Sequence, residues 1–495
     1  MTDLPTKWEL ADGDDLFACV RGVTYSKADA ASTPADGLVP ILRANNITNG
    51  DIVADDLVYV PAKYVSPEQY LRAGDLLIAT SSGSRTVVGK AATASEEHKP
   101  YAFGAFCTVA RPRVEGLGDW LSLFARTRAY RDYVEQVALG ININNLRGSD
   151  LKSMMVRLAP LPEQRRIVSK IDSLTGKSRP ARDHLDHIPR LAEKYKQAVL
   201  AAAFRGDLTR EWRAEKGGNV DGETLIEAVR AERDTIRRQR GLRTKGRNRS
   251  VPTKIIDLTN LPLGWGWATF DDCSWDMTVG HVGPMKDRYV DKGITFLRSL
   301  NVRPNRVDLT KVVYIDRGFN DELVKSQLHP GDLVVVRTGE PGVAAVIPAE
   351  LGLANCSDLV IARLVNSVNP HFAAYYMNSD YAQSVVGGFQ VGVAQQHFNV
   401  GAMSEMPLPL VSESEQQEIV RRIETAFVWI DRLASEATSA RRLIDRLDQA
   451  VLAKAFRGQL VQQDPADEPA SILLERIRAG RGAAPKARRG RRSAA

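Results

Sequence analysis

The sequence predicts a mixed α/β protein in which two divergent globular segments alternate with two long helices of similar sequence. Three observations lead to this prediction. The second half of the chain repeats landmarks of the first, the repeated segments carry a helical period, and the segments between them contain short strand patterns. The chain has 495 residues, of which 43% are apolar and 26% charged. This balance is typical of a soluble globular protein, and the length suits about three domains of ~150 residues.

The internal repeat is the strongest of these observations. Between residues 163 and 206 the offset to the second copy is a constant 252, and 16 of the 44 aligned positions are identical. Landmarks outside this stretch recur at offsets up to 257. The paired landmarks are Leu4-Pro5 and Leu261-Pro262, Leu42-Arg43 and Leu297-Arg298, Gly74-Asp75 and Gly331-Asp332, Glu163-Gln164 and Glu415-Gln416, and Phe204-Arg205-Gly206 and Phe456-Arg457-Gly458.

The two divergent segments, 1–160 and 251–411, read as mixed α/β domains. In each, a Gly-Asp turn at Asp75 or Asp332 leads into a short apolar run, which is typical of a turn followed by a strand. Further β-rich runs occur at 56–60 and 311–315. Helical stretches are predicted near 120–137 and 371–386.

The repeated segments are predicted to be helices with a coiled-coil seam. Steps of four and three residues from Ile167 and from Ile419 each give apolar residues at ten of eleven positions. A sustained period of 3.5 favours a coiled coil, whereas a helix packed on its own domain would show a wider stripe of period 3.6. The predicted seam and docking residues are Ile167, Ile171, Leu185, Ile188, Ile419, Ile423, Ile430, Leu433, Ile444, Phe204 and Phe456.

The first repeated helix carries Gly176, Pro180 and Pro189, which the second copy lacks. Proline removes a backbone donor and clashes with the preceding turn, so this helix is predicted to be kinked or split near 176–180. Gly206 and Gly458 follow the last apolar positions and suit helix ends. The predicted segments are 1–160, 161–250 with a basic linker, 251–411, 412–480 and a basic tail at 481–495.

Several function classes are excluded by what the sequence lacks. The four cysteines are far apart and form no CxxC pair, so a disulfide framework and a zinc ribbon are not expected. No apolar run reaches the ~18–20 residues of a membrane span, which predicts a cytoplasmic protein without a membrane segment. Phosphate-binding GxxxxGK[ST] loops, dinucleotide GxGxxG loops, HExxH, GxSxG and the Asn/Asp-Pro-Pro-Tyr/Phe segment of amino-methylating enzymes are all absent.

One catalytic alternative remains open. Asp75, Glu97 and Lys99 follow the D…ExK order of a magnesium-dependent nuclease, in which carboxylates hold the metal and lysine polarises the phosphate. The second copy has Asp332 but no ExK after it, which favours a turn role for Asp75. No metal site is therefore predicted, and an autonomous nuclease is kept only as the alternative from another class.

Polar clusters follow predicted strands at matching places in both halves. Arg, Asn, Gln and Ser hydrogen-bond base edges and phosphates, although Asn and Ser also favour ordinary turns. The candidate DNA contacts are Arg43, Asn45, Asn46, Ser82, Ser84, Arg85, Asn142, Asn144, Asn145, Arg298, Asn301, Arg303, Arg337, Gln395, Gln396 and Asn399.

The net charge of +7 is a weak argument for DNA on a chain of this length. Residues 230–249 hold nine Lys or Arg and two acidic residues, and residues 481–495 hold six Lys or Arg and none. The positive charge is therefore confined to two short stretches that follow the repeated helices. These stretches are either solvated ends or contacts to the phosphate backbone.

The arrangement resembles the specificity subunits of type I restriction–modification systems. The resemblance is carried by Leu161-Pro162-Glu163-Gln164-Arg165-Arg166-Ile167-Val168, by Ser414-Glu415-Gln416-Gln417-Glu418-Ile419-Val420, by both Phe-Arg-Gly segments and by the Gly-Asp-Leu strands. It covers essentially the whole chain in the order variable domain, helix, variable domain, helix. The second copy departs in having Pro409 six residues before Glu415, where the first has Pro162 directly before Glu163.

The resemblance implies a subunit that reads DNA and assembles a complex without catalysing a reaction. Each variable domain would be a target recognition domain for one half of a bipartite asymmetric double-stranded site, and the helices would form an antiparallel coiled coil that spaces the domains. Two methyltransferase subunits would dock on the repeat, joined by restriction subunits. S-adenosylmethionine, ATP and magnesium would be bound by those partners, with no cofactor on this chain. A related system with a fused methyltransferase–nuclease partner is the other possibility that the resemblance leaves open.

Overall fold

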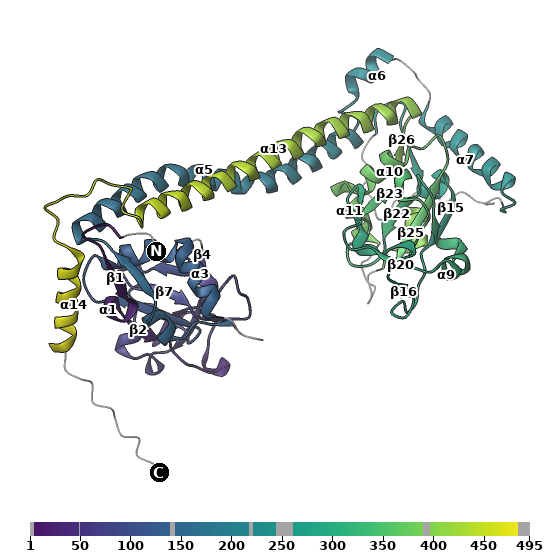
Figure 1. Cartoon of the computed structure of the whole chain (residues 1–495). Helices are drawn as coiled ribbons and strands as arrows, with labels where there is room; N and C mark the ends of the chain where they lie inside the picture. The colour runs from purple at the N-terminus through teal and green to yellow at the C-terminus, as the bar shows by residue number, and fades with distance from the viewer. Residues whose placement is uncertain are drawn as a thin grey trace, which may run out of the picture. The chain divides into compact units, whose positions relative to one another are not determined.

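The computed structural model describes residues 4–48, 50–138, 144–216, 221–243, 261–389 and 397–483. Asn142, Gln395 and Gln396 lie outside the described residues. The chain divides into two compact units (Figure 1). Unit 1 comprises Met1–Asp186 with Ser439–Ala495, and unit 2 comprises His187–Thr438. Each unit thus combines one divergent segment, which contains strands, with parts of both repeated helical segments. This agrees with the predicted mixed α/β fold.

Unit 1 contains a four-stranded antiparallel sheet in the order β2-β11-β7-β9. Its strands are β2 (Phe17–Arg21), β11 (Cys107–Pro112), β7 (Leu76–Ala79) and β9 (Ala91–Thr93). A second sheet has the order β10-β3-β6 and is formed by β10 (Ala102–Phe103), β3 (Leu38–Leu42) and β6 (Val58–Pro61). Strand β7 follows the Gly-Asp turn as predicted, and all four of its residues are buried.

Unit 2 repeats this topology. Its four-stranded sheet has the order β15-β25-β22-β23, formed by β15 (Ser274–Val279), β25 (Leu359–Leu364), β22 (Leu333–Val336) and β23 (Ala344–Val346). The second sheet is β16-β20-β17-β24-β21, formed by β16 (Tyr289–Val290), β20 (Val313–Ile315), β17 (Ile294–Leu297), β24 (Ala354–Cys356) and β21 (Gln327–Leu328). The sheet order around β22 matches that around β7, so the repeat extends into the divergent segments.

A two-stranded ladder closes each of the two divergent segments, 1–160 and 251–411, beside the start of a long helix. These segments are called recognition segments below, after the role that the sequence resemblance implies. In unit 1, β1 (Glu9–Asp12) pairs antiparallel with β13 (Met155–Leu158). In unit 2, β14 (Gly266–Thr269) pairs with β26 (Pro407–Leu410) in the matching register. Two helices follow β11, α2 (Leu117–Ala125) and α3 (Arg128–Val137), and two follow β25, α10 (Pro370–Met377) and α11 (Asp380–Gly388).

The repeated segments form two long helices, α5 (Leu161–Phe204) and α13 (Glu413–Ala455). The predicted split of the first helix is wrong, because α5 runs without interruption through Gly176, Pro180 and Pro189. Each proline removes only one backbone donor, so the other hydrogen bonds of the helix keep it continuous. Two hydroxyl groups near residue 176 also bind carbonyls of their own helix. Thr175 Oγ1 donates to Ile171 O at 2.9 Å, and Ser178 Oγ donates to Thr175 O at 3.1 Å.

The two helices pair antiparallel within each unit (Figure 1). In unit 1, Arg182 of α5 pairs with Asp448 of α13, and Arg441 Nε lies 2.9 Å from Asp186 Oδ1. In unit 2, Lys196 Nζ lies 2.6 Å from Asp431 Oδ1. Residue numbers rise along one helix as they fall along the other, which is the antiparallel order. The pairing in the middle of the seam is therefore partly ionic.

The seam departs from the predicted heptad at Leu433. Its side chain is 55% exposed, whereas Ile430, Ala434 and Ala437 are half-buried or buried. The buried stripe passes through the residue after Leu433 and keeps the heptad spacing of four and three residues on either side of it, so the 3.5-residue period holds and only the predicted register differs there. Ile167, Ile171, Ile419 and Ile423 are fully buried, and Leu185, Ile188 and Ile444 are half-buried.

This difference gives a matched pair of variants for the seam in unit 2. Ile430→Asp should lower the free energy of unfolding by about 1–3 kcal/mol, because it places a charge against the partner helix. Leu433→Asp should change it by less than ~0.5 kcal/mol, because that side chain is already exposed to water. Urea unfolding of the two variants measures the contrast, and equal losses would mean that the two helices do not pack through this stripe.

The ends of the long helices belong to the cores of the units. In unit 1 the main core combines Ile167 and Ile171 of α5 with Leu452 and Ala455 of α13 and with Phe456 just beyond it. In unit 2 the corresponding core includes Phe204, Ile419 and Ile423. Phe456 lies 4.4 Å from Trp120 between ring centroids, and Phe204 lies 5.3 Å from Phe372. Each recognition segment is thus fixed to the helical pair by an aromatic cluster.

A shorter helix follows each long one and packs back on the recognition segment. Helix α7 (Gly222–Gln239) contacts α8 (Phe270–Cys273) in unit 2, and α14 (Ala470–Ala483) contacts α1 (Gly13–Leu16) in unit 1. The first part of the predicted basic linker is therefore helical. Arg230 Nε donates to Asp272 Oδ1 at 2.8 Å, and Arg233 is 1% exposed. In unit 1, Arg478 takes the place of Arg230 and binds Asp15.

Candidate nucleic-acid interface

Two loops that are distant in sequence meet in unit 1. Leu146 N donates to Thr80 O at 2.8 Å, which joins the loop after β7 to the Asn-rich segment. Beside this bond, β8 (Ser81–Ser82) pairs antiparallel with β12 (Asn144–Asn145), so Ser82 lies opposite Asn144. Asn145 is exposed and Asn144 is buried. The structure therefore brings together three candidates that are separated by about sixty residues of sequence.

The same junction recurs in unit 2 with different side chains. Phe398 N donates to Arg337 O at 3.0 Å, at the positions that match Leu146 and Thr80. The Arg337 guanidinium lies 3.8 Å from a carboxylate oxygen of Asp358. Asn399 is exposed, but its side chain accepts the Ala402 N–H at 2.9 Å and caps α12 (Val400–Glu405). Unit 2 thus presents a cation where unit 1 presents hydroxyl and amide groups.

A further pair of candidates follows β3 and β17. Arg43 Nη2 donates to Asp56 Oδ2 at 2.8 Å, and Asn45 Nδ2 donates to the same oxygen at 3.2 Å. Arg298 Nη2 donates to Lys311 O at 2.9 Å. Asp56 has a φ of 51°, in the left-handed region that non-glycine residues rarely adopt. Arg43 and Asn45 are thereby held in one orientation by a residue in an unusual backbone conformation.

Asn46 and Asn301 have a structural role in both units. Asn46 Oδ1 accepts the Arg43 N–H at 2.9 Å, and its amide donates to Val53 O at 2.9 Å. Asn301 makes the equivalent bonds to Arg298 N and Asp308 O. Both side chains are at most 1% exposed, so neither faces solvent where a base edge could reach it. We therefore leave them out of the proposed contact surface.

The remaining candidates lie near the two loop junctions. Ser84 and Arg85 are exposed in the loop after β8. Ser84 Oγ hydrogen-bonds Thr86 Oγ1 at 2.9 Å. Arg303 Nη1 lies 3.6 Å from Glu340 Oε2, which connects it to the loop after β22. These contacts are exposed and leave donors directed toward solvent.

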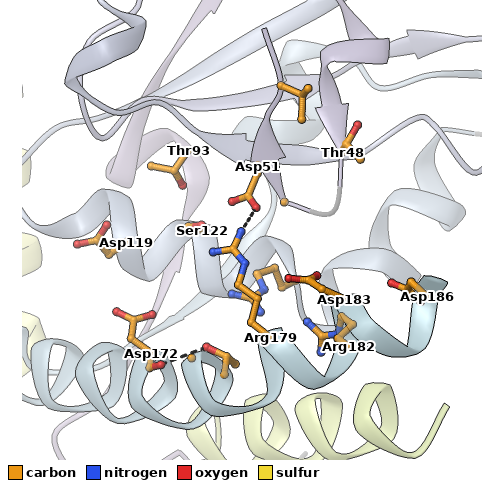
Figure 2. A pocket seen from close by; sticks show the side chains of 15 residues that line it. Thr48, Asp51, Thr93, Asp119, Ser122, Asp172, Arg179, Arg182, Asp183 and Asp186 are labelled. Atoms are coloured by element: carbon orange, nitrogen blue, oxygen red, sulfur yellow. Dashed lines mark hydrogen bonds and ion pairs between the residues drawn. The ribbon is translucent and has the colours of Figure 1, made fainter. Parts of the chain in front are cut away.

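A large cleft in unit 1 has the wrong charge for phosphate. It has a volume of about 690 Å³ between α2, α5 and the hairpin of β4 (Ile47–Thr48) and β5 (Asp51–Ile52). Figure 2 shows aspartates on several sides of it and Arg179 reaching Asp51. Burial and the neighbouring Asp172 raise the pKa of Asp119. The five aspartates outnumber the three arginines, so DNA is not expected to enter this cleft.

Asp75, from the nuclease alternative, is a buried structural group. Its two carboxylate oxygens accept hydrogen bonds from Arg111 Nε at 2.9 Å and Nη2 at 2.7 Å, and the side chain is 1% exposed. In the second copy Asp332 lies 3.6 Å from Arg363. Lys99 is exposed and pairs with Glu96. Because the Asp75 position is a repeated ion pair beneath a strand, these residues support a turn role.

Each long helix begins with the same buried cluster. Trp8 Nε1 donates to Glu163 Oε2 at 3.0 Å, and Trp265 Nε1 donates to Glu415 Oε2 at 3.1 Å. Gln164 and Gln416 each donate to a backbone carbonyl five residues earlier. Burial raises the pKa of Glu163, against the opposing effect of the Trp8 hydrogen bond. The Glu-Gln pairs found in the sequence are therefore joints between helix and recognition segment.

Comparison with known proteins gives one consistent result. The family model described as "Type I restriction modification DNA specificity domain" matches residues 5–182. The EcoKI specificity subunit of Escherichia coli K12 is 29% identical over 97% of both chains. The StySPI specificity subunit of Salmonella potsdam is 28% identical over 97% of this chain and 96% of its own.

A solved structure titled as the complex assembly and conformational transition of the type I R-M system covers 92% of this chain and 100% of its own. The TM-score is 0.61 at 18% identity, which shows the fold. Over nearly its whole length the chain is similar to specificity subunits of type I restriction–modification systems. Its mixed α/β fold with two units and long paired helices is similar to the fold of that solved structure.

An exposed aromatic residue that sequence patterns did not single out lies beside the loop junction of unit 1. Phe106 is 70% exposed, and its carbonyl accepts the Thr80 and Ser81 N–H groups at 2.8 and 3.1 Å. The matching position in unit 2 is Asp358, whose backbone oxygen accepts the Arg337 N–H at 3.3 Å. The sequence signal for Phe106 is an aromatic residue in the turn before a strand. This signal is weak, because single exposed aromatic residues are common on protein surfaces.

The part of the chain that the structure describes holds neither a cluster of metal-binding side chains nor a membrane-spanning helix. Within those residues, no group of three or more His, Cys, Asp or Glu side chains is arranged to hold a metal ion. No helix in the described part of the chain has the length and apolar character needed to cross a bilayer.

Proposed function

We propose that this chain is a specificity subunit that reads a bipartite asymmetric DNA site, with one half of the site contacted by each unit. The observation that carries the proposal is the repeated loop junction. The bonds Leu146 N to Thr80 O and Phe398 N to Arg337 O place the same two loops together in both units. The side chains at the junction differ, with the exposed Asn145 in one unit and the half-buried Arg337 in the other. Arginine favours guanine and asparagine favours adenine, so the half-sites should differ in sequence.

The long helices would set the spacing of the two half-sites. Helix α5 has 44 residues, a length of about 66 Å at 1.5 Å per residue. A paired helix is stiff compared with a polar linker, so two readers joined by it accept only a narrow range of spacer lengths. Joining the readers also makes the second contact intramolecular, which raises overall affinity for the complete site.

The subunit would act by recognition and assembly, with the chemistry on partner chains. We propose that two methyltransferase subunits dock on the helical pair and that restriction subunits join through them, in the cytoplasm where DNA is accessible. Apolar side chains on the open side of α13 suit such docking, since Trp429, Leu443 and Leu447 are each at least 60% exposed. S-adenosylmethionine, ATP and magnesium would be bound by those partners, and this chain would need no cofactor of its own.

Coexpression with a cognate methyltransferase subunit tests this function. The expected result is a complex that methylates adenines in a bipartite asymmetric site, with no transfer by the isolated specificity subunit. Failure to form a complex with any methyltransferase subunit of such a system would contradict the proposal. Magnesium-dependent cleavage by the isolated chain, lost in Lys99→Ala, would restore the nuclease alternative.

Variants of the two loop residues Asn145 and Arg337 separate the two half-sites. Asn145→Ala should relax specificity at one position of the half-site read by unit 1, and Arg337→Ala at one position of the other half. Each loss should weaken DNA binding by about 1–3 kcal/mol, the value of one bidentate base contact. Lys99→Ala is the matched exposed control and should leave specificity unchanged. Binding to a library of randomised sites measures this, and relaxation of both half-sites by either variant would contradict the assignment.

A further inference from the structure

Unit 1 contains an apolar cavity that the proposed function does not use. It has a volume of about 390 Å³ and lies where β1, the start of α3 and the end of α13 meet. Its apolar wall is formed by Leu10, Phe124, Ala129, Met155, Leu452 and Phe456. Leu10 and Met155 are 46% and 44% exposed and form the mouth, whereas Phe124 and Phe456 are buried. A cavity that is apolar inside and open to solvent can receive an apolar group.

In unit 2, other side chains occupy the position that corresponds to this cavity. Leu10 pairs with Arg157 across the β1–β13 ladder, and Trp267 pairs with Pro409 at the same register of β14–β26. Thr127 and Ser379 cap α3 and α11 through equivalent bonds, to Tyr130 N and Ala382 N. Two residues after each cap come Ala129 and Tyr381. Leu10 and Ala129 in unit 1 therefore correspond to Trp267 and Tyr381 in unit 2.

The two glutamines on the long helices support this correspondence. Gln449 Nε2 donates to Arg126 O, and Gln197 Nε2 donates to Asn378 O, both at 3.0 Å. Arg126 and Asn378 are the last residues before the two caps. The frame around the cavity is thus the same in both units, and the difference lies in the side chains that fill it.

In unit 2 an aromatic pair fills the position. The rings of Trp267 and Tyr381 stack with centroids 6.0 Å apart and an interplanar angle of 28°. Tyr381 also lies 6.4 Å from Tyr376, which corresponds to Phe124 of the cavity wall. Leucine and alanine are too small to replace these two rings, so the place remains open in unit 1. The sister unit therefore indicates that this frame accommodates aromatic rings.

The charges at the mouth also differ between the units. Arg128 and Arg157 of unit 1 correspond to Asp380 and Pro409 of unit 2. Arg457 contributes a third cation, and its Nε donates to Gln459 Oε1, a neutral acceptor, at 3.2 Å. Arg128 is balanced in part by the exposed Asp132 at 2.6 Å. The mouth of the cavity therefore favours a carboxylate next to the apolar group.

We propose that this cavity receives an aromatic side chain with a neighbouring carboxylate, supplied by the partner protein docked on unit 1. The inference rests on the proposed function for the identity of that partner as a methyltransferase subunit. The ring comes from another chain, because the segments outside the described residues contain no Phe, Trp or Tyr. Buried aromatic anchors surrounded by arginine are typical of the residues that dominate protein interfaces. Two partners of identical sequence are then held differently, and only the partner on unit 1 inserts a ring.

Indole-3-acetate is the probe for the cavity on the full-length chain. The double variant Leu10→Trp/Ala129→Tyr transplants the unit 2 pair and should abolish saturable binding of the probe, as followed by NMR. The double charge variant Arg128→Asp/Arg457→Glu leaves the apolar wall intact and should weaken binding about tenfold or more, through the lost carboxylate contact. Lys63→Glu, an exposed charge outside the cavity, is the control. Equal binding by the wild type and the Leu10→Trp/Ala129→Tyr variant, or no saturable binding by the wild type at millimolar probe, overturns the inference.

Assembly with the methyltransferase subunit tests the partner. The Leu10→Trp/Ala129→Tyr variant should bind one of two methyltransferase subunits at least tenfold more weakly, while the other is unchanged. Arg128→Asp/Arg457→Glu should act in the same direction if the first variant is misfolded. Two undiminished partners on both variants would overturn the inference and leave the proposed function intact. If the wild type binds no methyltransferase subunit, the proposed function fails, and the partner assignment fails with it even where indole-3-acetate binds.

Discussion

Replacing Asp272 with alanine is expected to lower the free energy of unfolding of unit 2 by about 3–5 kcal/mol. The Asp272 carboxylate is fully buried and accepts two hydrogen bonds from Arg230, at 2.8 and 3.2 Å. It also lies 3.6 Å from Arg233 and accepts the Thr269 N–H at 3.0 Å. The hydrogen bond to Asp272 raises the pKa of Arg230. Removing the carboxylate removes this effect, but a guanidinium stays protonated at neutral pH without it. The variant therefore leaves the half-buried Arg230 guanidinium without the carboxylate that it binds, and it removes one of the two carboxylates beside the buried Arg233.

Asp15 supplies the matched control, because it has the corresponding position in unit 1. It pairs with Arg478 at 2.7 Å, but the arginine is 54% exposed and water replaces the lost partner. Asp15→Ala should therefore change the free energy of unfolding by less than ~1 kcal/mol. Hydrogen exchange of peptides from each unit, measured at increasing urea concentration, gives the free energy of unfolding of each unit separately. Equal losses in the two variants would mean that the buried pair in unit 2 does not stabilise α7 against the recognition segment.

Phe456→Ala is expected to lower the free energy of unfolding of unit 1 by about 3–5 kcal/mol, because it leaves a cavity among packed aromatic rings. The Phe456 ring is 7% exposed and lies 4.4 Å from Trp120 and 5.7 Å from Phe124 between centroids. It also joins the end of α13 to the recognition segment. The loss should therefore loosen the helical pair near residues 440–455 as well as the domain core.

Two further substitutions serve as comparisons for the Phe456→Ala variant. Phe106→Ala removes a ring that is 70% exposed and should change stability by less than ~0.5 kcal/mol. Phe204→Ala, at the matching position of unit 2, should reproduce the Phe456 effect in the other unit. Thermal unfolding combined with hydrogen exchange distinguishes the units. A Phe456→Ala variant as stable as Phe106→Ala would show that the end of α13 is not part of the unit 1 core.

The features predictable from sequence were those set by local pattern. The Gly-Asp turns at Asp75 and Asp332 give strands because a short apolar run follows a turn, which needs no tertiary information. The long helices begin where the Glu-Gln pairs predicted, since apolar positions recur through more than ten turns. The internal repeat was the main basis for predicting the fold class, because two segments of similar sequence fold in similar ways.

The sequence-based predictions that failed concern features that tertiary packing determines. Proline inside α5 lowers local helix propensity, yet the rest of the helix and its partner keep it continuous. Leu433 satisfies the predicted heptad pattern, but the buried stripe of α13 keeps its 3.5-residue period in a register that passes through Ala434 instead. Asn46 has the residue type of a base contact, although it is buried as a turn residue. The joint between Trp8 and Glu163 needed a pairing over 155 residues, which no local pattern indicates.

The central claim is that each unit reads its own half of the DNA site, and exchange of one recognition segment tests it most directly. Residues 1–160 are replaced by the corresponding segment of a relative with a different target, and the methylated motif is mapped across the host genome. One half of the motif is expected to change, while the other half and the spacer length remain the same. A change in both halves, or in the spacer, would contradict the central claim.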